Sequence, residues 1–253
     1  MHKHKLKKYY KISIITVCLN SEKKIEKCIN SVNKQNYPKN KIEHIIIDGK
    51  SSDNTLRIIK KHRKKLSYWE SSKDNGIYDA VNKGIKKCSG DIIGILNSDD
   101  VYYNNTLKIV NYYFDNFQLD YLFGAVNHKK IYHGFYPNKI WYKFNIYPSH
   151  SVSFFIKKKS QFKIGLYDNK FKYSADRDLF FRLIKSKMLG MATPKKYIFG
   201  KFDIYGISSK LSFLKYTIIE ESKIRIKNKQ NLIFILLLAV VRIAYQIVRK
   251  IIK

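Results

Sequence analysis

Two acidic segments contain the residues that could do chemistry in this chain. The first follows an apolar run and reads Asn-Ser-Asp-Asp at positions 97–100, and the second reads Asp-Arg-Asp at positions 176–178. Adjacent carboxylates raise each other's pKa unless a positive charge lies between them. A divalent cation supplies that charge, and oxygen ligands suit Mn²⁺ or Mg²⁺. Residues 97–100 therefore indicate either a metal site or an exposed turn, because Asn, Ser and Asp are common turn residues.

The first hundred residues alternate between strand-like and helix-like segments. Apolar runs predict strands at 11–18, 42–47, 67–70 and 91–96, and one-sided apolar spacing predicts helices at 22–33, after Asp53 and at 77–88. This alternation is typical of right-handed βαβ units around a mostly parallel sheet, so we expect an α/β fold. Ligands of such sheets bind beyond the carboxyl ends of the strands. Because Asn20, Asp48 and Asp99 all lie at strand ends, we expect them at that edge.

The second half of the chain has a less regular pattern. From Tyr121 onward, short strand-like runs are rich in Tyr and Phe, and a further helix is expected at 178–188. The tail differs again, because ten consecutive apolar residues at 232–241 precede several cations. These cations are Arg242, Arg249, Lys250 and Lys253. The apolar stretch is shorter than the roughly 20 residues that a membrane span needs. It favours a helix at the surface of an anionic membrane, and a helix packed on the domain or on a second subunit is the alternative.

The composition narrows the class of protein. Lys and Arg number 50 and Asp and Glu number 19, so the formal net charge is +31, which attracts polyanions. The alternative function is a basic nucleic-acid-binding protein without catalytic activity. This alternative leaves the carboxylates unexplained, and the sequence contains no nucleic-acid-binding motif. We therefore expect no nucleic-acid partner. The chain also lacks a P-loop and the glycine-rich fingerprint of dinucleotide enzymes.

The cysteines and the N-terminus indicate a cytoplasmic location. The three cysteines are Cys18, Cys28 and Cys88, which form neither an even set nor a metal-binding spacing. Residues 1–10 are basic but lack the apolar core of a secretory signal.

Several segments in a fixed order resemble the family 2 glycosyltransferases of GT-A fold. They are Ile14–Asn20, Ile47–Thr55, Asp74–Gly84, Gly90-Asp91, Asn97–Asp100 and Ala175–Asp178. The resemblance is nearest to the bacterial branch that decorates cell-surface polysaccharides and lipid-linked glycans. It implies a GT-A domain at 11–210, which is Rossmann-like, with a mostly parallel central sheet flanked by helices. A basic tail at 1–10 would precede this domain, and a helical, membrane-associating tail at 211–253 would follow it.

The resemblance also implies a role for individual residues. The nucleotide-sugar site would contain Val17, Asn20, Asp48, Asp74, Asn82, Lys83 and Asn97. Asp48 would accept a ring N–H of the base, Asp74 would contact the nucleotide, and Asn82 and Lys83 would reach the phosphates. Turn formation is the alternative role for Asp48, and solvated helix positions are the alternative for Asn82 and Lys83.

The metal and the catalytic base are implied in the same way. Asn97-Ser98-Asp99 occupies the place of the family's DxD motif, with Asn for the first Asp, so Asp99 is the main candidate ligand of Mn²⁺ or Mg²⁺ and Asp100 the second. Asp176 matches the Asp of the family's catalytic acidic pair, although Ala175 stands where many relatives have Glu. It would take the proton of the acceptor hydroxyl. Capping of the helix is its alternative role, and Asp178 is the alternative base.

The acceptor side is expected near His150, Gly206 and Ser208, with packing as the alternative role for His150. The function implied is inverting transfer of a sugar from a nucleoside-diphosphate sugar, with UDP favoured, to a hydroxyl of a glycan or lipid-linked acceptor. We expect the enzyme to lie on the inner face of the cell membrane. The oligomeric state stays open.

Overall fold

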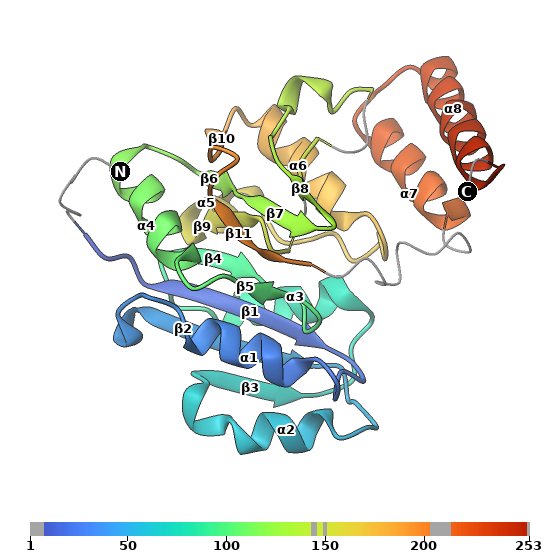
Figure 1. Cartoon of the computed structure of the whole chain (residues 1–253). Coiled ribbons are helices and arrows are strands. Elements are labelled where there is room, and N and C mark those ends of the chain that lie inside the picture. Colours follow the sequence, from blue (N-terminus) through green and yellow to red (C-terminus); the bar gives the residue numbers. More distant parts are fainter. Residues whose placement is uncertain (1–7, 143–145, 149–150, 203–213, 252–253) are drawn as a thin grey trace.

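The apolar runs of the first half form the centre of one sheet. A computed structural model describes residues 8–142, 146–148, 151–202 and 214–251 (Figure 1). The strands of its main sheet are β1 (Ile12–Cys18), β2 (Ile42–Asp48), β3 (Tyr68–Ser71), β4 (Ile92–Ile95), β6 (Tyr121–Phe123), β9 (Phe154–Lys157) and β10 (Gly190–Ala192). Their order is β10-β6-β9-β4-β1-β2-β3. All neighbours run parallel except β9, which is antiparallel to β4 and β6. The expected α/β fold with a mostly parallel sheet is confirmed.

A smaller sheet of four strands accompanies the main one. Its strands are β5 (Val101–Tyr102), β7 (Ala125–His128), β8 (Lys130–Tyr132) and β11 (Ile198–Lys201), in the order β5-β11-β7-β8. These strands come from the irregular second half and from the segment directly after Asp100. The smaller sheet therefore ties the irregular half to the end of β4.

Helices cover the main sheet on both faces. They are α1 (Ile25–Asn33), α2 (Thr55–Lys61), α3 (Ile77–Lys87), α4 (Thr106–Asn116), α5 (Lys158–Ile164), α6 (Ala175–Lys185), α7 (Leu214–Lys227) and α8 (Leu232–Ile251). Helix α6 begins at Ala175 rather than at the expected 178, so Asp176 and Asp178 both lie in its first turn. The expected helical tail comprises two helices, α7 and α8.

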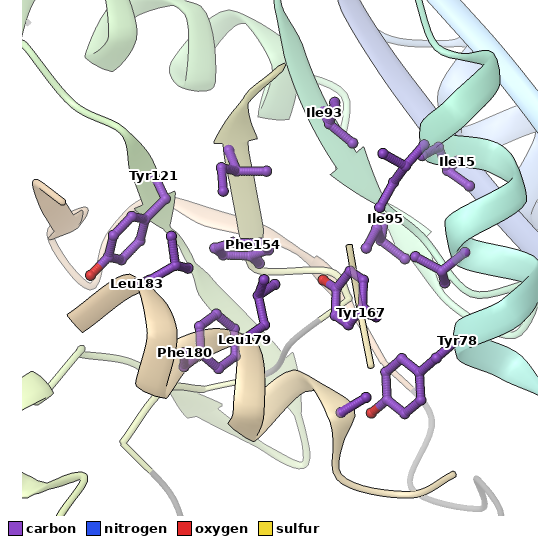
Figure 2. Packing of buried hydrophobic residues seen from close by; sticks show 14 of the residues in the cluster. Ile15, Tyr78, Ile93, Ile95, Tyr121, Phe154, Tyr167, Leu179, Phe180 and Leu183 are labelled. Atoms are coloured by element: carbon purple, nitrogen blue, oxygen red, sulfur yellow. The ribbon is translucent and has the colours of Figure 1, made fainter. Parts of the chain in front are cut away.

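Strand β1 is buried on both of its faces, as its continuous apolar character requires. Ile12 and Ile14 pack in a cluster with residues of α1 and α4. Ile15 and Val17 face the opposite way, into a second cluster built largely from α3 and α6. Figure 2 shows this second cluster, in which Tyr78 lies close to the first turn of α6. The cluster therefore brings α3 and α6, which are distant in sequence, together on one side of the sheet.

The C-terminal helices lie side by side at one end of the molecule (Figure 1). Among the residues described, none of the helices combines the length and apolar character needed to cross a membrane.

Candidate active site

The segments that follow β1, β2 and β4 meet at one edge of the main sheet. In the parallel register, Cys18 at the end of β1 lies opposite Asp48 at the end of β2. On the other side of β1, the backbone N–H of Ser98 donates to the carbonyl of Val17 over 3.2 Å, and the hydroxyls of Ser21 and Ser98 are 2.8 Å apart. The expected gathering of these strand ends is therefore present in the structure.

Asp48 is fully buried and is held by neighbouring hydroxyl groups. Its Oδ1 accepts a hydrogen bond of 2.5 Å from Ser51 Oγ, and its Oδ2 accepts one of 2.6 Å from Ser71 Oγ and one of 3.1 Å from the Ser51 backbone N–H. These bonds compensate the cost of burying the carboxylate. In this structure, Asp48 thus joins the loop that follows β2 to the end of β3, and its contact with a base stays a prediction.

Val17 and Asn20 have different surroundings although both belong to the β1 end. Val17 is buried in the core. Asn20 is exposed and adopts a positive φ of 50°, a conformation that Asn tolerates better than most residues. Its Oδ1 accepts a hydrogen bond of 2.9 Å from the Ser52 N–H, and its own N–H donates to Ser51 Oγ over 2.8 Å. Asn20 therefore turns the chain and fixes the loop after β2.

Asp74 lies against Gly49, directly after β2. A Cβ atom placed on Gly49 would be only 2.6 Å from Asp74 Oδ2, so the glycine leaves the room that this carboxylate occupies. Asp74 Oδ1 accepts a hydrogen bond of 2.9 Å from the Gly76 N–H at the start of α3. The structure thus brings Asp74 to the same edge as Asp48.

The side chains of Asn82 and Lys83 hold loops in this structure. The buried amide of Asn82 donates to the Tyr167 carbonyl over 2.8 Å and accepts from the Tyr167 N–H over 3.0 Å. The ammonium group of Lys83 donates to the Lys73 carbonyl over 2.9 Å and to Ser72 Oγ over 3.1 Å. Their expected contact with phosphates stays a prediction.

The segment after β4 offers oxygen atoms that fit a divalent cation. Asn97 Oδ1 is buried and has no hydrogen-bond partner among the described residues, an arrangement that costs free energy unless a ligand compensates it. Asp99 is partly buried, whereas the buried Asp100 accepts a hydrogen bond of 2.8 Å from Ser151 Oγ. Within the described ranges, His, Cys, Asp and Glu side chains nowhere gather in a group of three that could hold a metal ion. The residues present therefore suit a cation that takes its remaining ligands from a bound diphosphate.

Asp176 lies in the first turn of α6, and two phenol groups from other segments donate hydrogen bonds to its carboxylate. Tyr78 donates to Oδ1 over 3.1 Å, and Tyr147 donates to Oδ2 over 2.5 Å. Burial, and then the negative charge of Asp176, raise the pKa of both phenols well above the ordinary value. Both tyrosines therefore remain protonated donors at every pH near neutrality, and they fix the orientation of the carboxylate.

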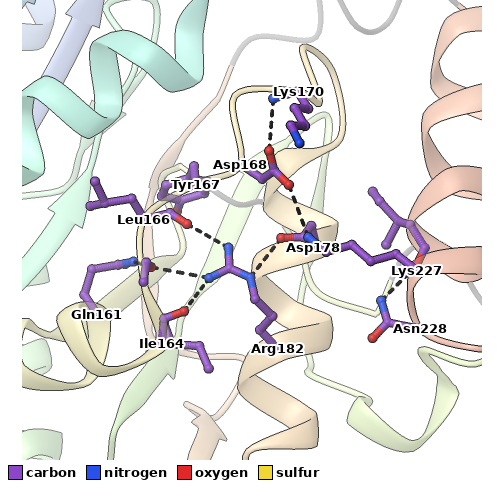
Figure 3. Close-up of polar contacts among 12 residues, drawn as sticks. Gln161, Ile164, Leu166, Tyr167, Asp168, Lys170, Asp178, Arg182, Lys227 and Asn228 are labelled. Atoms are coloured by element: carbon purple, nitrogen blue, oxygen red, sulfur yellow. Dashed lines mark hydrogen bonds and ion pairs between the residues drawn. The ribbon is translucent and has the colours of Figure 1, made fainter.

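Asp178 faces a different set of residues (Figure 3). It is fully buried, and it accepts hydrogen bonds of 2.8 Å from Arg182 Nε and of 2.8 Å from Lys227 Nζ. Arg182 also donates to the carbonyls of Ile164 and Leu166. Asp178 thus fastens α6 to α7, and its partners differ from those of Asp176.

The three residues expected on the acceptor side, His150, Gly206 and Ser208, lie outside the described residues. Conversely, the sequence analysis did not single out Tyr78 or Tyr147. Tyr78 could have been found, because it belongs to the segment Asp74–Gly84 that resembles the family. No feature of the neighbouring sequence points to Tyr147.

Comparisons with known proteins find relatives in sequence and in fold. The sequence pattern described as glycosyl transferase family 2 matches residues 13–184. An uncharacterised glycosyltransferase of Mycobacterium tuberculosis is 38% identical over 89 residues, which is 35% of this chain and 34% of that protein. The poly(ribitol-phosphate) β-N-acetylglucosaminyltransferase TarS of Staphylococcus aureus is 34% identical over 115 residues, 44% of this chain and 20% of TarS. The matches therefore span about a third or less of these relatives.

Solved structures show the same fold at low sequence identity. The TarS fragment 1–349 in complex with UDP-GlcNAc has a TM-score of 0.65 and 19% identity, and the likeness covers 89% of this chain and 69% of that one. The mannosyltransferase PcManGT of Pyrobaculum calidifontis, in complex with GDP-Man and Mn²⁺, has a TM-score of 0.69 and 13% identity, with 94% of this chain and 75% of that one covered. The expected GT-A fold is confirmed.

Proposed function

The chain belongs to glycosyl transferase family 2, and from this premise we propose that it is an inverting glycosyltransferase. It moves a sugar from a nucleoside-diphosphate sugar to a hydroxyl acceptor. The position of Asp176 carries the proposal. Its carboxylate is hydrogen bonded to Tyr78 of α3, and α3 follows the Asp74 loop that lies against the end of β2. These contacts support a base near the strand ends, where ligands of such sheets bind.

Asp176 acts as the general base in this reaction. It takes the proton of the acceptor hydroxyl while the acceptor oxygen attacks the anomeric carbon and the bond from that carbon to the diphosphate breaks. One in-line displacement inverts the configuration at the anomeric carbon. Each Asp176 oxygen accepts one phenol hydrogen bond and keeps a further lone pair for the proton. Asp178 is unsuited to this role because Arg182 and Lys227 hold its two oxygens.

A UDP sugar is the favoured donor. TarS resembles this chain in both sequence and structure, and it has been solved in complex with UDP-GlcNAc. Asp48, Asp74 and Asn20 are the proposed nucleotide contacts, since they lie at the shared edge of the sheet. When bound, Mn²⁺ or Mg²⁺ would stabilise the leaving diphosphate. Asn97 and Asp99 would hold it, and this role gives a partner to the unpaired Asn97 Oδ1.

We further propose a glycan or a lipid-linked acceptor. TarS supports a glycan-type acceptor, because its name gives poly(ribitol-phosphate) as the polymer that it modifies. A lipid-linked acceptor would bring the reaction to the inner face of the cell membrane, in the cytoplasm.

The test is a binding screen of the purified protein against UDP, GDP and dTDP sugars with Mn²⁺. The proposal predicts saturable binding of one nucleotide class, with hydrolysis of the same donor when water replaces the acceptor. If none of these donors binds with or without the metal, the proposed function is wrong.

A further inference from the structure

Helix α8 presents an apolar face that the rest of the described chain leaves exposed. The outward side chains recur at the three- and four-residue spacing of one helix face. They are Leu232, Ile233, Leu236, Leu237, Val240 and Val241, and each is between 58% and 69% exposed. The opposite face packs on α7, where Ile235 is only 4% exposed. Contiguous apolar surface of this kind marks an interaction site.

Helix α7 also exposes aromatic, apolar and cationic side chains. Tyr216, Ile219 and Ile226 are between 45% and 51% exposed, and Lys215 and Lys223 are exposed on the same helix. Tyrosine and lysine both favour the boundary between a membrane and water, because each combines an apolar body with a polar end. We call these α7 and α8 residues together the α7–α8 face.

The charge in the middle of α8 is turned away from the α7–α8 face. Arg242 interrupts the apolar run, but its guanidinium group pairs with Glu221 of α7 and donates to Thr217 Oγ1 over 3.4 Å. Glu221 is only 3% exposed and also pairs with Arg177, the residue after Asp176. The outward side of α8 therefore stays apolar along its first three turns, and one buried carboxylate connects α8 and α6 through α7.

We propose that the α7–α8 face binds the surface of an anionic membrane. Two occupants suit an apolar helix face, a membrane and a second copy of this chain. The formal net charge of +31 opposes self-association and favours anionic lipid, and the exposed lysines of α7 would meet the lipid headgroups. The helix lies in the interface and does not cross it, since Arg242 sits at its centre and remains paired within the protein.

The experiment is co-sedimentation of the full-length protein with vesicles. One set contains phosphatidylcholine and phosphatidylglycerol in equal parts, and the other contains phosphatidylcholine alone. The protein is expected to pellet with the anionic vesicles and to be released by high salt. Leu236→Asp should weaken this binding roughly tenfold or more, because it removes one exposed leucine that the membrane would bury. Phe162→Asp is the matched control, because Phe162 is 50% exposed on α5, outside the face, and it should bind like the wild type.

A second variant keeps the test valid if Leu236→Asp fails to fold. Lys223→Glu leaves the apolar residues in place and should weaken binding to the anionic vesicles, with the wild-type melting temperature. Full-length protein that stays in the supernatant with anionic vesicles at low salt would overturn the proposal. So would unchanged binding of both variants. Sedimentation velocity without lipid tests the other occupant. If the wild type is a dimer and Leu236→Asp is a monomer, the α7–α8 face binds a second copy of the chain and the membrane proposal is wrong. None of these readouts depends on sugar transfer.

Discussion

Tyr78 donates its phenol hydrogen to Asp176 Oδ1 over 3.1 Å, and this contact joins two residues that are 98 positions apart in the chain. It connects α3, which starts next to the Asp74 loop, with the first turn of α6. Tyr147 makes the matching contact on Oδ2. The orientation of the proposed base therefore depends on two segments that the sequence separates widely.

Tyr78→Phe should lower turnover without changing donor affinity. The variant loses one of the two phenol hydrogen bonds that fix the orientation of the Asp176 carboxylate, and a misplaced base can lower kcat by up to about 10²-fold. Hydrolysis of the donor selected in the binding screen measures kcat, and a donor titration measures Kd. Tyr68→Phe is the control, because its phenol donates to Glu70 at the edge of the sheet, and it should turn over like the wild type. An unchanged kcat in Tyr78→Phe would reduce Tyr78 to a packing residue.

Asp99→Ala is expected to abolish transfer and the metal-dependent part of nucleotide binding. The physical reason is the loss of the charged oxygen ligand beside Asn97. Asp100→Ala should have a milder effect on the metal, because Asp100 is already bound to Ser151. Calorimetric titration of UDP or GDP with and without Mn²⁺ measures both. Equal nucleotide affinity of the wild type under the two conditions would contradict the metal role.

Asp178→Asn should reduce stability more than it reduces chemistry. The change removes the buried charge that pairs with Arg182 and Lys227. Removing one partner of a buried ion pair typically lowers the free energy of unfolding by several kcal/mol. Because Lys227 is partly exposed and solvent screens its charge, we expect a loss of about 2 kcal/mol. Urea denaturation measures the loss. Asp168→Asn, at a partly exposed carboxylate of the same network, should cost less. Loss of turnover without loss of stability would point to Asp178 as the base.

His44 should make the protein less stable in acid. It is buried in β2 beside Thr16, and burial lowers the pKa of His44 to about 3. An unfolded histidine has a pKa of about 6.5, so between these values the unfolded state binds the additional proton. The contribution of His44 is therefore complete above pH 6.5 and is lost progressively as the pH falls. Between pH 7 and pH 5 this loss is about 2 kcal/mol. Urea titrations at both pH values measure the free energy of unfolding. Between pH 7 and pH 5 the wild type should lose about 2 kcal/mol more than His44→Gln, and an equal loss in both proteins would refute the assignment.

The parallel centre of the fold could be predicted because its signals are local. β1, β2 and β4 are apolar runs, and polar residues mark their ends, so the placement of Asn20, Asp48 and Asp99 followed from the geometry of parallel strands. Helix α4 has Leu107, Val110 and Phe114 at helical spacing, a signal that was present but not used.

Contacts between distant segments could not be predicted in the same way. Asp176 and Asp178 occupy one helical turn, and their partners Tyr78, Tyr147 and Lys227 lie elsewhere in the sequence. The sequence also contained no sign that the amide of Asn82 contacts the backbone of Tyr167, 85 residues away. Likewise, the inward turn of Arg242 depends on Glu221 in the preceding helix.

The central claim is that Asp176 is the base of a sugar-transfer reaction. Its most direct test is the rate of nucleoside diphosphate release from the bound donor by wild type and by Asp176→Asn, with donor affinity measured in parallel. The substitution preserves shape and removes the basic group, so kcat should fall by roughly 10² to 10⁴ while the Kd of the donor stays close to the wild-type value. Near-wild-type turnover by Asp176→Asn would contradict the account.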